Sequence, residues 1–293
     1  MLICYIQDKE LKEITVTESF LTIFANLKTK KMILQFIHWN ISPTIFSIGP
    51  VSVRWYGLLF AMSFVVGYFI MLRIFRKENI PESLLDQLSM YMLIATVVGA
   101  RLGHVMFYEP ESYLAHPLDI LKIWEGGLAS HGAAIGIILA LYLFSRKTRQ
   151  PFLWVIDRIV IVVALSGLFI RTGNLFNSEI YGNVTNLPWG FVFERAGETL
   201  PRHPTQIYEG LCYLGIFFYL LWYYFHKQGK PRPGYLFGFF LVTLFTARLI
   251  IEFLKEPQVN FENSMALNMG QLLSIPFIIA GIVILARKPK ITK

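Results

Sequence analysis

Ionisable residues that could hold a charged ligand recur where the apolar segments of this sequence begin or end. Residues 171–182 read R-T-G-N-L-F-N-S-E-I-Y-G and directly follow a long apolar run. Arg248 and Glu252 lie four residues apart in a later run, so they share one face of a helix. Arg101 and His104, three residues apart in an earlier run, do the same. Arginine binds anions and histidine moves protons.

The composition places these residues in a membrane protein. Of the 293 residues, 55% are apolar and 16% are charged, and the mean hydropathy is +0.51, which is too apolar for a soluble domain. A membrane-spanning helix needs about 20 residues, and these runs lack the alternation of barrel strands. The fold class expected is an all-α membrane protein, a polytopic bundle of seven transmembrane helices. The predicted spans are Val53–Ile74, Leu84–Phe107, Leu128–Phe144, Phe152–Phe176, Gln206–Phe225, Gly234–Leu254 and Met269–Ala286.

The positive charges of the loops predict how the bundle is oriented. Lysine and arginine gather in alternate loops, at residues 73–77, 146–149, 227–232 and 287–293. By the positive-inside rule these loops are cytoplasmic, so the N-terminus is expected outside and the C-terminus inside. Loops facing anionic lipid explain the net charge of +8, and no nucleic-acid partner is expected.

With this orientation, most polar residues of the spans gather at the outer side of the membrane. An ionised residue at the centre of a span costs about 2.5 to 3.5 kcal/mol, so these side chains should face one another or a wet cavity. Their modest excess of positive charge suits an anionic lipid head group. Taken singly, Arg248 and Glu252 could be an intrahelical pair, Arg101 could reach the interface, and His131 could be a hydrogen-bonded core histidine. Asp157 and Arg158, near the cytoplasmic end, are expected to be structural.

Two segments lie outside the predicted spans. Residues 177–203 contain several glycines and prolines and predict a small extracytoplasmic cap over the polar pocket, after which Pro204 restarts a helix. Residues 1–31 do not match a signal peptide, because their apolar patch precedes the basic cluster, and their five lysines would lie on the outer side. They predict a mis-assigned or dispensable N-terminal extension, with Met32 as the start of the seven-helix domain at 32–293. Two cysteines, Cys4 and Cys212, give no disulfide framework or metal cluster.

Six motifs resemble the prolipoprotein diacylglyceryl transferase family. They are W-Y-G-L at 55–58, G-A-R-L-G at 99–103, W-E-G-G-L-A-S-H-G at 124–132, R-T-G-N-L-F-N-S-E-I-Y-G at 171–182, R-H-P-T-Q-I-Y-E at 202–209 and M-G-Q-L-L-S-I-P at 269–276. The resemblance runs in order from about Ile41 to Arg287. The sequence departs from the family pattern at Ile170, where glycine is usual, and at Leu175, where phenylalanine is usual. Both changes leave the polar members intact.

The resemblance implies transfer of a diacylglyceryl group from phosphatidylglycerol to the lipobox cysteine thiol of a prolipoprotein signal peptide. Glycerol 1-phosphate would be released, in the first step of bacterial lipoprotein maturation. It also implies a multi-pass protein of the bacterial cytoplasmic (inner) membrane, with its active site at the outer leaflet. Phosphatidylglycerol, the prolipoprotein and membrane lipids are the expected partners, and neither a metal nor another cofactor is expected.

The same resemblance implies roles for particular residues. Arg171 is expected to hold the donor phosphate, which its planar fork of donors fits. His131 is expected to assist thiol deprotonation, although a field centred on arginine remains an alternative. Arg248 is expected to stabilise the leaving phosphate or the thiolate, with Glu252 fixing its rotamer. The expected catalytic residues are thus His131, Arg171 and Arg248, and the expected substrate-binding residues are Tyr56, Arg101, Arg171, Asn174, Glu179, His203, Gln206, Glu209 and Glu252.

Two other function classes fit the sequence less well. A metal-dependent phospholipid synthase needs several aspartates at helical spacing, whereas Asp86 and Asp157 are isolated. A transporter would carry a polar site at the midplane and broken helices, and the only hint of a repeat is A-R-L in two spans. The sequence therefore favours the transferase.

Overall fold

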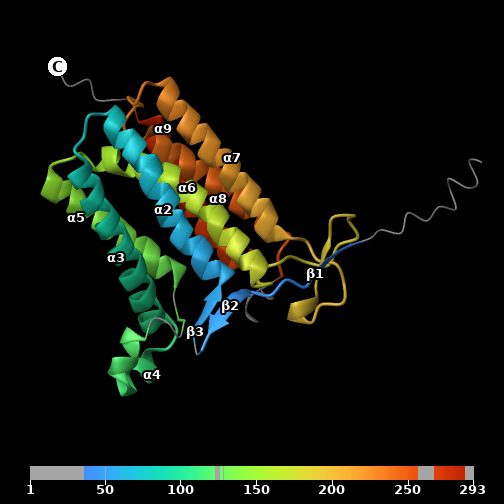
Figure 1. Cartoon of the computed structure of the whole chain (residues 1–293). Helices are drawn as coiled ribbons and strands as arrows, with labels where there is room; N and C mark the ends of the chain where they lie inside the picture. Colours follow the sequence, from blue (N-terminus) through green and yellow to red (C-terminus); the bar gives the residue numbers. More distant parts are fainter. Residues whose placement is uncertain (1–35, 50, 123–125, 128, 257–266, 288–293) are drawn as a thin grey trace, which may run out of the picture.

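The computed structural model describes residues 36–49, 51–122, 126–127, 129–256 and 267–287. Long helices run side by side, and short strands lie at one end of them (Figure 1). The predicted N-terminal extension at 1–31 lies outside the described residues. The long helices are α2 (Trp55–Lys77), α3 (Glu82–Phe107), α5 (Ser130–Thr148), α6 (Phe152–Phe176), α7 (Thr205–His226), α8 (Tyr235–Glu252) and α9 (Met269–Ala286).

Five of these helices are long and apolar enough to cross a membrane, namely α2, α3, α6, α8 and α9. The prediction of a helical multi-pass membrane protein is therefore confirmed. Helices α5 and α7 are 19 and 22 residues long but are not among the five. Helix α7 carries Gln206, Glu209 and many tyrosines, which lower its hydropathy. The count of seven spans stays a prediction.

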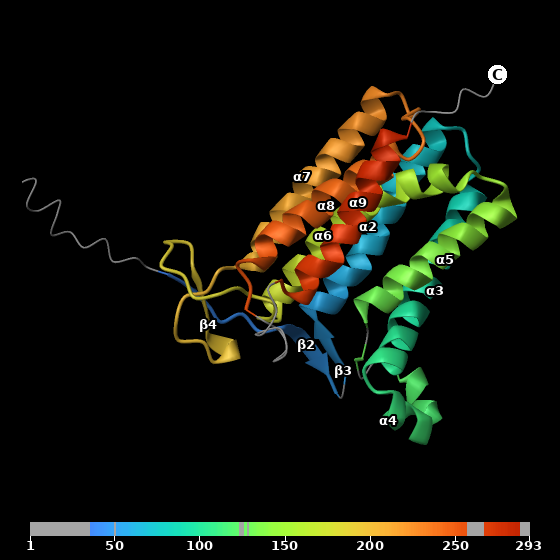
Figure 2. The same cartoon turned by 180° about the vertical axis from the view of Figure 1, so that it is seen from behind.

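Helix α6 forms the centre of the bundle. It packs against α2, α7 and α8, and its residues Val155, Ile161 and Ala164 are fully buried. Helices α3 and α5 pack mainly against each other, and in both views they diverge from the other helices toward α4 (Pro110–Ala115) (Figure 1, Figure 2). The bundle thus consists of a main body around α6 and a closely packed α3–α5 pair.

Glycines allow α3 and α5 to approach closely. A Cβ atom added at Gly99 would lie 2.6 Å from the carbonyl oxygen of Gly132, and one added at Gly103 would lie 2.6 Å from the Cα atom of Gly132. Backbone atoms of two helices cannot move aside as a flexible side chain can. Contacts this short therefore require glycine on α3.

The Gly99→Ala variant is expected to lower the free energy of unfolding by about 1 to 3 kcal/mol, because overpacking forces the two helices apart. Thermal unfolding in detergent would measure this. Gly215→Ala in α7 is the matched control, since an added Cβ there has no atom within 4 Å. Equal melting temperatures for the two variants would contradict the close packing of α3 and α5.

Two small sheets lie beyond one end of α6. Strand β1 (Ile37–Trp39) pairs in parallel with β4 (Phe191–Phe193), and β2 (Thr44–Ile48) pairs antiparallel with β3 (Val51–Arg54). The indole nitrogen of Trp39 donates to the carbonyl oxygen of Leu175 at 2.9 Å, which fixes β1 on the end of α6. The predicted cap segment at 177–203 thus contains a strand, followed by the short 3-10 helix η3 (Glu194–Ala196). Its position outside the membrane stays a prediction.

The opposite end of the bundle holds the charged pair that the sequence marked as structural. The Asp157 carboxylate accepts hydrogen bonds from the backbone N–H groups of Gly234 and Phe237, at 2.6 and 2.9 Å, and so binds the first turn of α8. Arg158 forms an ion pair with Glu78 at 3.0 Å. Both residues hold helices together, as anions at a helix N-terminus and buried ion pairs do.

Candidate active site

Four charged residues form a buried cluster that links α6, α7 and α8 at the end nearest β1 and β4. Arg171 of α6 forms an ion pair with Glu209 of α7. The ammonium group of Lys255, just after α8, lies 2.6 Å from Oε1 of Glu209 and 3.2 Å from Oε2 of Glu252. Glu209, Glu252 and Lys255 are all buried. We call Arg171, Glu209, Glu252 and Lys255 the charge cluster; its two cations and two carboxylates balance.

Hydrogen bonds extend the charge cluster toward the cap. Arg171 donates to Oδ1 of Asn174 at 3.0 Å, and Asn174 donates to Oε1 of Glu179 at 2.7 Å. The Gln206 amide donates to the carbonyl oxygen of Glu179 at 2.6 Å. Within the described part of the chain, Oε1 of Gln206 and Oδ1 of Asn177 are buried without a hydrogen-bond partner. Such unpaired acceptors are costly unless a ligand donates to them.

Tyr56 lies at the same end of the bundle. It begins α2, and a Cβ atom added at Gly173 of α6 would lie 2.7 Å from its ring carbon Cδ2. Gly173 therefore lets the tyrosine ring pack directly on α6, two residues along from Arg171. Tyr56 therefore lies near Arg171 of the charge cluster, and its expected role in substrate binding stays a prediction.

Arg248 does not pair with the carboxylate that the sequence predicts for it. The expected pair between Arg248 and Glu252 is absent from the described residues, because Glu252 binds Lys255 instead. The main chain of Lys255 is bridged to Gly182, which brings the ammonium group under the cap and against Glu252. Across the described ranges, the partly buried Arg248 forms no ion pair. Its positive charge is therefore available to an anion.

The hydrogen bonds of Arg101 go to the loop after α3 rather than to the charge cluster. Its buried guanidinium donates to the backbone carbonyl oxygens of Ile120 at 2.8 Å, Gly126 at 2.7 Å and Asp119. The ring of Tyr113 lies 4.9 Å away, measured to the ring centroid. These contacts occupy the guanidinium and anchor the loop. The structure thus gives Arg101 a role in positioning the loop after α3, and its expected role in substrate binding stays a prediction.

His131 is exposed at the start of α5. Its Nε2 atom lies 3.0 Å from the hydroxyl oxygen of Tyr108, whose ring stacks on the imidazole of His104. None of the hydrogen bonds or ion pairs among the described residues joins His131 to the charge cluster. The imidazole is therefore open to an incoming molecule, on the α3–α5 pair rather than on the main body.

His203 lies in the cap, before α7. Its Nδ1 atom is 3.2 Å from the hydroxyl oxygen of Tyr208, which accepts a hydrogen bond from the indole of Trp189 at 2.9 Å. Burial lowers the pKa of His203, which favours the neutral imidazole. His203 thus stabilises the cap close to Gln206, and it does not contact the charge cluster in the described structure.

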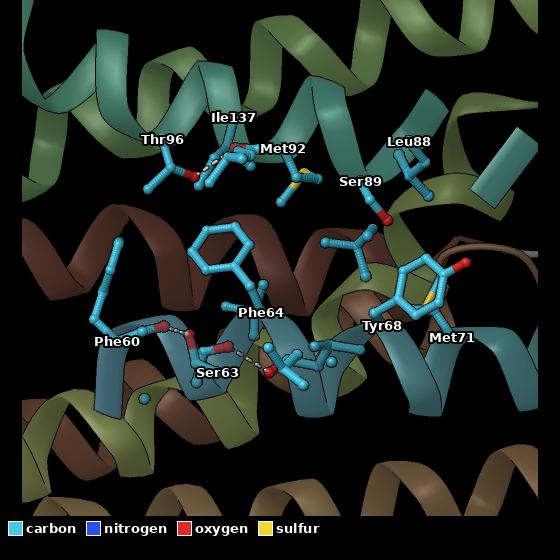
Figure 3. Close-up of a pocket in the computed structure, with 18 of the residues that line it drawn as sticks. Phe60, Ser63, Phe64, Tyr68, Met71, Leu88, Ser89, Met92, Thr96 and Ile137 are labelled. Carbon is cyan, nitrogen blue, oxygen red and sulfur yellow. Dashed lines mark hydrogen bonds between the residues drawn. The ribbon is translucent and has the colours of Figure 1, made fainter. Parts of the chain in front are cut away.

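An apolar cavity of about 700 Å³ lies between α2, α3, α6 and α8. Figure 3 shows Phe60 and Phe64 of α2 facing Met92 and Thr96 of α3 across this space. Ile170 and Tyr213 also line the cavity, and the guanidinium of Arg171 interacts with Tyr213. One side of the cavity therefore lies near the charge cluster.

Comparison with known proteins agrees with the motifs. The family described as prolipoprotein diacylglyceryl transferase matches residues 43–287. The chain belongs to this family. A phosphatidylglycerol–prolipoprotein diacylglyceryl transferase of Tolumonas auensis is 52% identical over 255 residues, which is 87% of this chain and 98% of the relative. Proteins of the same name from Chloroherpeton thalassium and Porphyromonas gingivalis are 46% and 45% identical, over 87% of this chain and 96% and 95% of their own lengths.

Membership of the prolipoprotein diacylglyceryl transferase family makes the chain a membrane-bound transferase. The matched segment includes every predicted site residue, from Tyr56 to Glu252. It also includes Lys255, which the sequence reasoning missed as a site residue. Lys255 lies beyond the end of α8, and its bridge to Gly182 places the ammonium group against Glu252, so the sequence alone carried no clear signal for it.

Proposed function

We propose that this chain transfers the diacylglyceryl group of phosphatidylglycerol to the lipobox cysteine of a prolipoprotein and releases glycerol 1-phosphate. The observation that carries the proposal is the position of the apolar cavity beside the charge cluster. A phospholipid has the same arrangement, with apolar chains next to one phosphate. Family membership and the names of the relatives support the same reaction.

The donor lipid fits this arrangement from its chains to its head. Acyl chains in the cavity would lie against Phe64 and Met92, and the phosphate would reach Arg171 next to Ile170. The glycerol hydroxyl groups of the head would then donate to the unpaired acceptors of Gln206 and Asn177. Hydrogen bonds to buried acceptors discriminate strongly against head groups that lack hydroxyls.

The transfer requires a thiolate and a stabilised leaving phosphate. The cysteine sulfur forms a bond to the terminal glycerol carbon of the diacylglyceryl group, and the bond between that carbon and the phosphate oxygen breaks. Arg171 and the unpaired Arg248 would stabilise the phosphate charge as glycerol 1-phosphate leaves. The thiol proton passes to a base, for which the exposed imidazole of His131 is our candidate.

The His131→Asn variant is expected to lose most activity at neutral pH and to recover part of it as the pH rises. A cysteine thiol has an ordinary pKa of about 8.5, so alkaline solution forms the thiolate without a base. The ratio of variant to parent rates, measured from pH 6.5 to 9.5, should therefore increase with pH. A ratio that stays low and constant would contradict base catalysis and indicate an orienting role.

A purified assay tests the function itself. The protein, phosphatidylglycerol and a synthetic lipobox peptide are mixed in detergent, and the peptide mass is followed. The peptide should gain one diacylglyceryl group, whereas a peptide with serine in place of cysteine should gain none. No mass gain with folded protein, under conditions where a known relative is active, would reject the proposal.

We also propose the location and orientation of the protein. The basic loops after α2, α5, α7 and α9 would face the cytoplasm, which places the charge cluster at the outer leaflet of the bacterial inner membrane. A lipobox cysteine arrives at the same outer side, at the end of its signal helix. Single cysteines introduced into the loops and labelled with a membrane-impermeant thiol reagent, in intact and in permeabilised cells, would test this orientation.

A further inference from the structure

A groove between α2 and α7 lies at the opposite end of the bundle from the charge cluster. It has a volume of about 330 Å³ and is lined by Ile70 and Arg73 of α2 and by Leu221 and Phe225 of α7. An α-helix rises about 1.5 Å per residue, so Arg73 lies about 26 Å along α2 from Tyr56. The groove is therefore separate from the candidate active site.

Two cations share the rim of this groove. Arg73 and Lys77 are four residues apart on α2, so they lie on one face of the helix. The guanidinium carbon of Arg73 lies 5.9 Å from the centroid of the Phe225 ring, and the ammonium nitrogen of Lys77 lies 5.7 Å from it. Both side chains are exposed. Contact with an aromatic ring attracts a cation but does not neutralise its charge.

The carboxylates near this rim are already paired with other residues. Glu82 binds Arg76 at 2.7 Å, and Glu78 binds Arg158 at 3.0 Å. Across the parts of the chain that the structure describes, neither Arg73 nor Lys77 forms an ion pair. The rim therefore holds two uncompensated positive charges side by side, which favours an anion.

The groove becomes apolar toward the middle of the helices. Ile70 lies one turn inward from Arg73, and Leu221 lies one turn inward from Phe225. Phe218 of α7, one further turn inward, is 58% exposed. A phospholipid in a bilayer has the same order of groups, with its phosphate at the interface and its chains toward the centre.

We propose that this groove binds one anionic phospholipid from the leaflet opposite the charge cluster. The phosphate lies between Arg73 and Lys77, and one acyl chain lies along Ile70 and Leu221. Basic pockets between membrane helices select anionic head groups in this way. A zwitterionic lipid brings its own cation to the same rim and binds more weakly.

Native mass spectrometry of the full-length protein tests the proposal, with phosphatidylserine as the anionic probe and phosphatidylcholine as the zwitterionic one. The double variant Arg73→Gln, Lys77→Gln is expected to bind phosphatidylserine about 30-fold more weakly at one site. The double variant Arg146→Gln, Lys147→Gln removes the same charges at the end of α5, where Lys147 contacts Tyr91, and should bind like the parent.

A third variant distinguishes binding in the groove from a general attraction of the lipid to positive charge. Ile70→Trp fills the apolar part of the groove and keeps both cations, and it should also weaken the binding of phosphatidylserine. Unchanged binding in Ile70→Trp, or equal weakening in both double variants, would overturn the proposal. Unchanged binding in the Arg73→Gln, Lys77→Gln variant would also overturn it.

Discussion

Replacement of Arg171 by lysine is expected to lower the rate of diacylglyceryl transfer about 100-fold or more, although the positive charge is kept. The guanidinium already binds Glu209 and Asn174 with separate nitrogen atoms, and its planar fork leaves further donors for a phosphate. An ammonium group has all its donors on one atom and cannot serve three partners in this geometry. Loss of two charge-assisted hydrogen bonds, at about 1.5 kcal/mol each, corresponds to about 100-fold in rate.

Initial rates with phosphatidylglycerol and a lipobox peptide measure this effect. Arg195→Lys is the matched control, because Arg195 is an exposed arginine of the cap, in η3. The control should keep the parent rate, and the melting temperatures of both variants should remain close to that of the parent. Near-normal transfer by Arg171→Lys would exclude the phosphate role of Arg171.

Replacement of Lys255 by methionine is expected to have the largest effect on stability. Methionine has nearly the same length but no charge, so Glu252 loses its ion pair and Glu209 keeps only Arg171. A buried carboxylate without its partner costs about 3 to 5 kcal/mol. The freed negative charge would also hold Arg171 more tightly and weaken its contact with phosphate, so transfer should fall as well.

The variant Lys255→Arg keeps the charge and is the control for this position. It should retain most of the stability, measured by thermal unfolding in detergent, and a measurable fraction of the activity. If Lys255→Met melts at the same temperature as the parent, the burial and pairing of Lys255 described above must be wrong.

The long helices could be predicted closely because apolar length alone determines them. The predicted spans Phe152–Phe176 and Met269–Ala286 coincide with α6 and α9. The strands could not be predicted, since β1 and β4 have three residues each and pair across more than half of the chain. Pairing at such a distance depends on where α6 ends and α7 begins.

The site was predictable in its residue types and only partly in its contacts. Arg171, Asn174, Glu179, Gln206 and Glu209 meet at one end of the bundle because neighbouring helices run in opposite directions. The partner of Glu252 was not predictable, because the ammonium group of Lys255 reaches it through a bridge between the cap and the end of α8. The role of Arg101 likewise depends on the fold of a loop rather than on the helix that carries it.

The apolar cavity also could not be predicted from the sequence. Its lining residues look like ordinary helix positions, and the space appears only because α3 and α5 pack on each other more closely than on the main body. We therefore expect substitution of Phe64 or Met92 to weaken binding of the donor lipid proposed for this cavity, without any polar group being changed.

A structure of this protein with bound phosphatidylglycerol would test whether the apolar cavity and the charge cluster hold the donor lipid. We expect the phosphate to lie within hydrogen-bond distance of Arg171 and an acyl chain to run between Phe64 and Met92. A head group bound to other side chains, with the cavity empty and the pair between Arg171 and Glu209 unchanged, would contradict it.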